Sequence, residues 1–282
     1  MNVKELIDYG KNTLKENETE DYTIIAKKLA KYVLKMNDSE LIINEQNNVE
    51  EEQEEYYKLE LIEIINGKPI QYITNSQEFY SNEFYVDNNV LIPQPDTEIL
   101  VEETLDIIKK NNKNVKVLDI CTGSGCIGIS IAANSKESKV IMSDISKEAL
   151  NVAQKNANKI LGDLSNIRFI ESDMFEEIEE ELDIIVSNPP YISFEELQNL
   201  DEQVKQEPII ALYGYEDGLG FYRILVEESH KYLSDDGYLC MEIGYKQKDE
   251  VIKLLEKNGN YKNIYSKKDL AGNDRIVIAQ RK

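Results

Sequence analysis

From Lys113 onward, the sequence alternates short apolar runs with longer amphipathic stretches, and this alternation limits the possible fold more than any other feature. Runs such as 115–121 and 182–188 have the length of buried strands, and 146–160 has the 3.6-residue period of a helix. Such alternation is typical of a mostly parallel sheet with helices on both faces. No helical pattern separates the last two runs, 262–269 and 274–280, so we expect the final strand to run antiparallel.

A glycine-rich loop follows the first of these runs. The segment DICTGSGCIG places Gly123, Gly125 and Gly128 in a G-x-G-x-x-G spacing, and Asp144 ends the second run roughly 20 residues later. Ligands of open α/β sheets bind at the carboxyl ends of the strands. The loop and Asp144 alone therefore predict either a dinucleotide such as NAD or FAD, or S-adenosylmethionine, whose ribose also binds a carboxylate.

Acidic residues at two other strand ends favour S-adenosylmethionine. Asp119 precedes the glycine loop, where a carboxylate suits a cationic ligand and repels a pyrophosphate. Asp173 ends the third run, and we expect it to accept a hydrogen bond from the adenine amine while Met174 or Phe175 packs on the ring. The alternative role for Asp173 is the N-cap of a helix formed by the residues that follow.

The fourth run ends in Asn-Pro-Pro-Tyr, residues 188–191. Proline cannot donate to a sheet ladder, so the strand stops here. The side-chain oxygen of Asn188 and the carbonyl of Pro189, held by the rigid Pro189–Pro190 pair, would accept hydrogen bonds from both N–H groups of an amide or an aromatic amine. They would thereby position its nitrogen for an in-line methyl transfer, while Tyr191 stacks on the planar group.

Composition limits the partners and the compartment. Acidic residues outnumber basic ones 54 to 32, and the formal net charge of −22 disfavours a nucleic-acid substrate; it fits either a basic protein partner or solubility alone. Three cysteines without zinc spacing and one histidine predict no metal site. The sequence has neither a membrane-length apolar run nor a signal-peptide pattern, so we expect a cytoplasmic protein, and nothing requires more than a monomer.

The chain has three regions of different character. Residues 1–75 repeat apolar positions at helical spacing and predict a small helical bundle, which we expect to recognise the substrate. Residues 76–95 predict a β-hairpin linker, with its turn near 81–83. Residues 96–282 form the predicted catalytic domain, beginning with a helix near Thr97 that Asp96 would cap.

The motifs together resemble a known family. NPPY with DICTGSGCIG resembles the class I, S-adenosylmethionine-dependent amino methyltransferases, which act on DNA adenine, ribosomal RNA guanine or protein glutamine. The segments PIQYIT, FYSNEFYV, VLIPQPDTE, EPIIALYGYEDGLGFYR, EIG with Gln247, and KDLAGNDRIV narrow this resemblance to the peptide chain release factor glutamine methyltransferases, the HemK/PrmC family. The similarity runs from about residue 65 to the end, and the helical start is similar to that family's N-terminal domain only in length and class.

The resemblance implies a fold and a reaction. The fold is an α/β, Rossmann-like, seven-stranded class I methyltransferase sheet with an antiparallel last strand and an N-terminal helical bundle. The reaction is S-adenosylmethionine-dependent methylation of the side-chain amide nitrogen of the glutamine in the Gly-Gly-Gln motif of class I release factors. The alternatives are a ribosomal-protein glutamine methyltransferase, a nucleic-acid amino methyltransferase, a non-catalytic scaffold and a dinucleotide oxidoreductase.

The expected site residues follow from the motifs and the resemblance. The expected cofactor-binding residues are Cys121, Thr122, Gly123, Ser124, Gly125, Asp144, Asp173, Met174 and Asn188. Catalysis and glutamine binding are expected from Asn188, Pro189, Pro190 and Tyr191, with Thr97 and Glu98 closing over the site.

Four positions depart from the family's pattern. Gln94 stands where many relatives have a charged Arg, and Met174 stands where many have Trp, which keeps apolar packing on adenine. Asn75 and Tyr215 stand where glycine is usual. Asn tolerates a left-handed backbone better than most residues, and the turn at Tyr215 is expected to differ.

Overall fold

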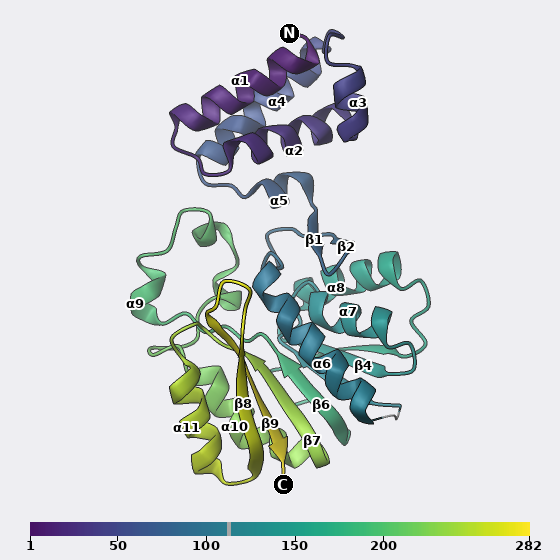
Figure 1. The fold of residues 1–282 in the computed structure, drawn as a ribbon, viewed down its shortest axis with the longest axis vertical. Coiled ribbons are helices and arrows are strands. Elements are labelled where there is room, and N and C mark those ends of the chain that lie inside the picture. The colour runs from purple at the N-terminus through teal and green to yellow at the C-terminus, as the bar shows by residue number, and fades with distance from the viewer. Residues whose placement is uncertain (112–113) are drawn as a thin grey trace. The chain divides into compact units, whose positions relative to one another are not determined.

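The computed structural model describes residues 1–111 and 114–282, which divide into two compact units (Figure 1). The first unit comprises Met1–Asn75 with Asp201–Gln206, and the second comprises Ser76–Leu200 with Glu207–Lys282. The segment Asp201–Gln206 therefore belongs to the helical unit, although no sequence pattern predicts this. The hairpin region that we expect to be a linker lies in the second unit.

The first unit is helical. Its helices are α1 (Val3–Glu16), α2 (Tyr22–Leu34), α3 (Asp38–Ile43), α4 (Glu51–Ile65) and α5 (Ile70–Thr74). Asn2 and Asn37 begin α1 and α3 with capping boxes that satisfy the free N–H groups of the first turn. α1 approaches α4 closely because Gly10 has no side chain: a Cβ there would overlap the phenol oxygen of Tyr57, which donates to the Ala26 carbonyl at 3.0 Å.

The second unit contains the predicted seven-stranded sheet, in the order β5-β4-β3-β6-β7-β9-β8. The strands are β3 (Lys116–Ile120), β4 (Lys139–Asp144), β5 (Ile167–Glu171), β6 (Leu182–Ser187), β7 (Leu233–Glu242), β8 (Tyr261–Lys268) and β9 (Asp274–Arg281). β9 pairs antiparallel with both β7 and β8, and the other pairs are parallel. The fold class predicted from the sequence is therefore confirmed.

Helices cover both faces of the sheet (Figure 1). α6 (Glu98–Asn111), α7 (Cys126–Asn134) and α8 (Lys147–Ile160) share one apolar core with the sheet, and α10 (Gly220–Tyr232) and α11 (Lys248–Asn258) share the other. Successive strand residues alternate between these cores, as Val117 and Leu118 do, because strand side chains point to opposite faces in turn. Shorter elements are α9 (Phe194–Leu197) and the 3₁₀ turns η1 (Pro95–Thr97), η2 (Val204–Gln206) and η3 (Ile209–Ala211).

A two-stranded hairpin precedes the sheet, formed by β1 (Gln77–Phe79) and β2 (Asn82–Phe84). Its turn is at Tyr80 and Ser81, both with positive φ, slightly before the 81–83 segment that we expected. Phe79 and Phe84 pack edge to face, with ring centroids 6.0 Å apart, in the core that contains α6 and α7. This apolar contact fixes the hairpin on the second unit.

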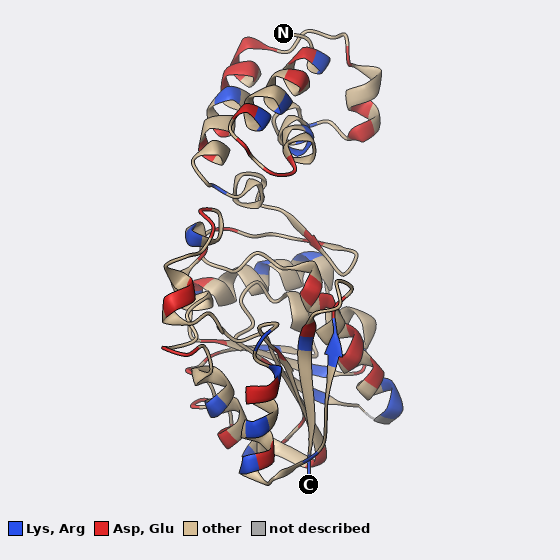
Figure 2. Cartoon of the chain, turned by 60° about the vertical axis from the view of Figure 1, so that its left-hand side comes forward, with Lys and Arg blue, Asp and Glu red and all other residues tan. Residues whose placement is uncertain are grey.

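Acidic and basic positions are interspersed on the helices of both units (Figure 2). In the densest basic stretch, in α2, Lys27 and Lys31 both bind Asp38, at 2.7 and 2.6 Å. None of the helices in the described residues is long and apolar enough to cross a membrane.

Candidate active site

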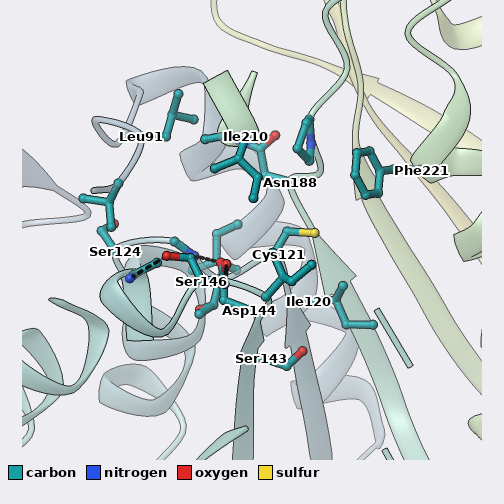
Figure 3. A pocket seen from close by; sticks show the side chains of 18 of the residues that line it. Leu91, Ile120, Cys121, Ser124, Ser143, Asp144, Ser146, Asn188, Ile210 and Phe221 are labelled. Atoms are coloured by element: carbon teal, nitrogen blue, oxygen red, sulfur yellow. Dashed lines mark hydrogen bonds between the residues drawn. The ribbon is translucent and has the colours of Figure 1, made fainter. Parts of the chain in front are cut away.

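A cavity lies at the carboxyl ends of β3, β4 and β6, where the strand order reverses on either side of β3 (Figure 3). Of the expected site residues, its lining includes Thr97, Cys121, Thr122, Gly123, Ser124, Asp144, Asp173, Met174, Asn188 and Pro190. Within the described part of the chain, Glu98, Gly125, Pro189 and Tyr191 are not among the lining residues. The structure thus brings most of the expected cofactor residues into one cavity with Thr97, Asn188 and Pro190.

Gly123 and Gly125 of the loop are required for different structural reasons. Gly123 lines the cavity with φ +54°, and a Cβ there would meet no atom within 4 Å, so its backbone is open to a ligand. Gly125 has φ +81°, and a Cβ there would lie 2.7 Å from the Ile129 Cδ1 and 3.1 Å from the Ala153 Cβ. The second glycine therefore permits close packing of the loop on α7 and α8.

Asp119 lies beneath the loop instead of facing a ligand. The side chain is fully buried and does not line the cavity. Its Oδ2 accepts hydrogen bonds from the Thr122 hydroxyl at 2.6 Å and the Gly128 N–H at 2.9 Å, and burial raises its pKa to about 7. The expectation that Asp119 faces the cationic part of a cofactor is wrong, because the side chain lies outside the lining; the loop and the start of α7 hold its Oδ2, and its Oδ1 is buried without a partner in the described residues.

Asp144 ends β4 and faces the cavity (Figure 3). Its Oδ2 accepts a hydrogen bond from the Gly123 N–H and its Oδ1 accepts one from the Ser146 N–H, both at 2.9 Å. Burial raises the pKa of this carboxyl. Each carboxylate oxygen can accept more than one hydrogen bond, so Asp144 retains capacity for a ligand hydroxyl.

The turn after β5 supplies the next wall. Asp173 is exposed at the cavity, and Met174, with φ +49°, is buried with its sulfur 4.0 Å from the Cys121 sulfur. Turns follow instead of a helix, so the N-cap role considered for Asp173 is wrong; the Ser172 hydroxyl donates to the Met174 carbonyl at 2.9 Å. The Phe175 ring stacks on the Tyr232 ring, with centroids 4.9 Å apart. Of Met174 and Phe175, therefore, only Met174 lines the cavity.

Asn188 faces the cavity from the end of β6, and Cys121 lies between Asn188 and Asp144 in this view (Figure 3). The Asn188 Nδ2 donates to the Thr97 hydroxyl at 3.4 Å. Tyr191 is half-buried outside the lining, and its carbonyl accepts from the Gln247 side chain at 3.0 Å. Gln247 thus fixes the turn that carries the two prolines.

Near the expected helix start at Thr97, Asp96 and Glu98 make contacts that differ from the predicted ones. Asp96 does not cap the helix; its carboxylate binds Arg275 of β9 at 2.9 Å. Glu98 accepts a hydrogen bond from the Tyr80 N–H at 2.8 Å, so it holds the hairpin turn. Arg275 also binds Asp269 at 3.0 Å, which connects η1 to the end of the sheet.

Sequence reasoning missed an apolar wall opposite the loop. Leu91, Ile210, Tyr215 and Phe221 line the cavity, and the Tyr215 ring lies 5.3 Å from that of Phe221. Tyr215 adopts φ +69°, the left-handed conformation that glycine favours. The signal was present in EPIIALYGYEDGLGFYR, but its periodicity does not show which side chains face the site.

Ionisable side chains in the lining have one sign of charge. Asp144 and Asp173 contribute carboxylates, and the described lining contains no Lys or Arg. Such a cavity suits a ligand with positive charge and disfavours a pyrophosphate, which binds where donors and positive charge converge.

Comparison with known proteins places the chain in a family. A family model described as the PrmC N-terminal domain matches residues 5–74, and one described as the methyltransferase small domain matches residues 95–210. The release factor glutamine methyltransferase of Clostridium acetobutylicum is 42% identical, over 100% of this chain and 99% of that protein. The protein of the same name from Buchnera aphidicola subsp. Baizongia pistaciae is 39% identical, over 100% of both chains.

Solved structures share the fold at lower identity. The catalytic domain of hMettl16 aligns with a TM-score of 0.61 and 18% identity, over 77% of this chain and 83% of that chain. The first family model also covers the helical start, where the sequence motifs alone show similarity only in length and class. With full-length relatives at about 40% identity, the chain belongs to the release factor glutamine methyltransferase family.

Proposed function

We propose that this chain methylates the side-chain amide nitrogen of the glutamine in the Gly-Gly-Gln motif of class I peptide chain release factors, using S-adenosylmethionine. The observation that carries the proposal is that Asn188 lines the same cavity as Asp144 and Gly123. One part of the cavity offers carboxylates and open backbone to a cofactor, and another offers an amide oxygen to a substrate. The curated names of full-length relatives support the release factor as substrate.

The residues at the ends of β3, β4 and β5 fit S-adenosylmethionine. Asp144 would accept hydrogen bonds from the ribose hydroxyls, and the open backbone at Gly123 permits the close approach that this requires. Asp173 would accept from the adenine amine, with Met174 packed on the ring. The acidic lining fits the positive charge of this cofactor.

Asn188 and its neighbours would position the acceptor nitrogen. When bound, S-adenosylmethionine supplies an electrophilic methyl carbon attached to a positively charged sulfur. The lone pair of an amide nitrogen is delocalised, so the protein must hold that nitrogen in line with the carbon. The Asn188 Oδ1 and the Pro189 carbonyl would accept from the two N–H groups, and the restricted φ of Pro189 and Pro190 keeps these acceptors fixed.

The rest of the expected substrate set has supporting roles in this proposal. Thr97 lies in the lining beside Asn188, and Tyr191 would provide a flat surface for the amide. Glu98 would act through the hairpin turn that it holds. The apolar residues Ile210 and Phe221 would exclude water from the hydrocarbon part of the glutamine.

A methyl-transfer assay with labelled S-adenosylmethionine tests this function. The acceptors are a purified class I release factor, its Gln→Ala variant in the Gly-Gly-Gln motif, total RNA and total DNA. We expect label on the wild-type factor alone. Label on RNA or DNA, or equal label on the Gln→Ala variant, would contradict the proposed substrate atom.

A further inference from the structure

A buried carboxyl group lies next to Asn188 and Thr97, and one of its two oxygens has no hydrogen-bond partner in the described residues. Glu242 is the last residue of β7 and is only 2% exposed. Its Oε2 is buried without a hydrogen-bond partner in the described residues. Cys240, two residues earlier and on the same face, belongs to the core that contains α6, so the Glu242 side chain points toward the start of α6.

Two residues of the cavity lining contact this carboxyl. The Thr97 hydroxyl and the Asn188 amide lie beside the Glu242 carboxyl and lower its pKa, and the Asn188 Nδ2 donates to the Thr97 Oγ1 at 3.4 Å. A hydroxyl that accepts one hydrogen bond still has its own hydrogen to donate. A hydrogen bond therefore joins the Asn188 amide to the Thr97 hydroxyl beside the Glu242 carboxyl, whose Oε2 has no partner in the described residues.

Charged and titratable groups from five other segments face Glu242, including the Tyr222 phenol of α10 and the Cys126 thiol of α7. Arg275 of β9 and Asp96 of η1 act on it, and the Tyr191 phenol lies in the same group. The Arg275 guanidinium is shared with Asp96 and Asp269, so it is not reserved for Glu242. Burial raises the pKa of Glu242 to about 7, and the hydrogen bond from Thr97 and the charge of Arg275 oppose the rise.

We propose that Glu242 is a positioning residue that sets the orientation of the Asn188 carboxamide. An ionised carboxylate only accepts hydrogen bonds, so it binds the NH₂ side of Asn188 and takes the hydrogen of Thr97. The Asn188 Oδ1 is then left for the cavity, where the glutamine amide needs an acceptor. A protonated Glu242 can donate instead, which removes this selection. Only the expected effect on methylation rests on the proposed function; the orientation of Asn188 does not.

Two substitutions of Glu242 test whether it orients the Asn188 carboxamide or only stabilises the surrounding structure. In Glu242→Gln the new amide both donates and accepts, so either orientation of Asn188 is satisfied; in Glu242→Ala the Thr97 hydroxyl loses its acceptor. We expect kcat for the release factor to fall by about 10–100-fold in both, similar to the loss found when a side chain that orients a metal ligand is removed. The dissociation constant for S-adenosylmethionine should change less than about twofold, because Glu242 does not line the cavity.

Glu103 offers a matched control. It is 3% exposed on α6, in contact with the same face of the sheet, but its carboxylate binds Tyr265 and Lys267, and it is not in the cavity lining. Glu103→Gln should lower the melting temperature without lowering kcat. An equal loss of kcat in Glu103→Gln would show that removing any buried acid here impairs the enzyme, and it would overturn the assignment to Glu242.

A spectroscopic readout tests the orientation without an acceptor substrate. The side-chain amide resonances of ¹⁵N-asparagine-labelled protein are followed from about pH 5.5 to about pH 8.5, a range that spans the pKa of Glu242 near 7. The Asn188 resonance, assigned by its loss in Asn188→Ala, should shift with pH in the wild-type protein and stay constant in Glu242→Gln. The same titration in both proteins, or none in the wild type, would overturn the inference. If the wild-type protein shows the titration but does not methylate the release factor, only the proposed substrate is wrong.

Discussion

Asn188 is the single residue on which the proposed chemistry depends most. Asn188→Ala removes the side-chain acceptor while leaving the Asp144 side of the cavity intact. We expect kcat to fall by about 100–1000-fold, similar to the loss of one preorganised polar group at a reacting centre. Isothermal titration with S-adenosylmethionine should give nearly unchanged affinity.

The control for this variant is Asn158→Ala. Asn158 is an exposed residue of α8 whose amide donates to the Gln154 carbonyl at 2.8 Å. It should retain wild-type activity. Methylation at the wild-type rate by Asn188→Ala would exclude the acceptor role.

Asp144 is expected to govern cofactor affinity instead of turnover. Asp144→Ala removes a charged acceptor at the end of β4 and frees the Gly123 N–H. Hydrogen bonds to charged groups contribute about 1.5–3 kcal/mol, so the dissociation constant for S-adenosylmethionine should rise about 10–100-fold. The exposed Asp249 of α11 is the matched control, and equal affinities for Asp144→Ala and Asp249→Ala would remove the ribose role.

Tyr215 shows how one side chain can occupy a glycine conformation. Its φ of +69° costs a non-glycine residue about 1–2 kcal/mol. Tyr215→Gly and Tyr215→Ala both remove the ring, but only the alanine variant keeps the unfavourable φ. We expect Tyr215→Gly to unfold at a higher urea concentration, with a stability difference of about 0.5–1 kcal/mol after the greater chain entropy of glycine is included. A more stable alanine variant would mean that the turn is not left-handed.

Among the elements, α8 connects the hairpin to the glycine loop through one buried side chain. The Asn156 Oδ1 accepts from the Tyr85 N–H at 2.7 Å, and its Nδ2 donates to the Tyr85 and Ser124 carbonyls, both at 2.9 Å. Asn156→Leu would leave these backbone groups unpaired, at about 1–3 kcal/mol for each buried group. We expect a lower melting temperature and weaker cofactor binding together.

The neighbouring substitution Asn158→Leu separates this effect from a general loss of α8 stability. Asn158 lies on the exposed face of the same helix. Thermal unfolding and cofactor titration of both variants should show a defect for Asn156→Leu alone. Unchanged cofactor affinity in Asn156→Leu would mean that the Ser124 contact does not support the loop.

The sequence predicts elements well where the period of apolar residues is clear. β3, β6 and α8 lie within one or two residues of the predicted segments 115–121, 182–188 and 146–160, because buried strands and one-sided helices leave distinct patterns. β7 begins at Leu233, and its first residues include polar positions without a strand pattern, because sheet pairing with β6 and not an apolar period places them in the strand. The contacts of Asp96 with Arg275 and of Glu242 with Asn188 join residues far apart in sequence, which local pattern cannot show.

For the whole molecule, buried carboxyl groups predict an unusual dependence of stability on pH. Burial raises the pKa of Asp119, Glu207 and Glu242 to about 7. Each group therefore binds its proton more tightly in the folded than in the unfolded chain, and the free energy of unfolding falls as pH rises from about 5 to about 8. Carboxyls with lowered pKa, such as Asp217 and Asp274, titrate below this range and do not oppose the slope.

Urea unfolding at several pH values measures this slope. Glu207→Gln should reduce it, because the amide oxygen can still accept from the Ile92 N–H, which lies 2.8 Å from the Glu207 carboxylate, while the titration is removed. Stability that stays constant between about pH 5 and about pH 8 would show that these carboxyls are ionised in the folded protein with ordinary pKa values.

The position of β9 has a consequence for synthesis. β9 follows β7 and β8 in the chain but lies between them in the sheet, so β8 has no strand to pair with until β9 has been made. During translation the edge of β7 therefore stays open, and an open edge invites pairing with other chains. β9 also carries Arg275, which faces Glu242 and binds Asp96. β9, which completes the sheet, and Arg275, which lies next to Glu242, are therefore synthesised together in one late segment.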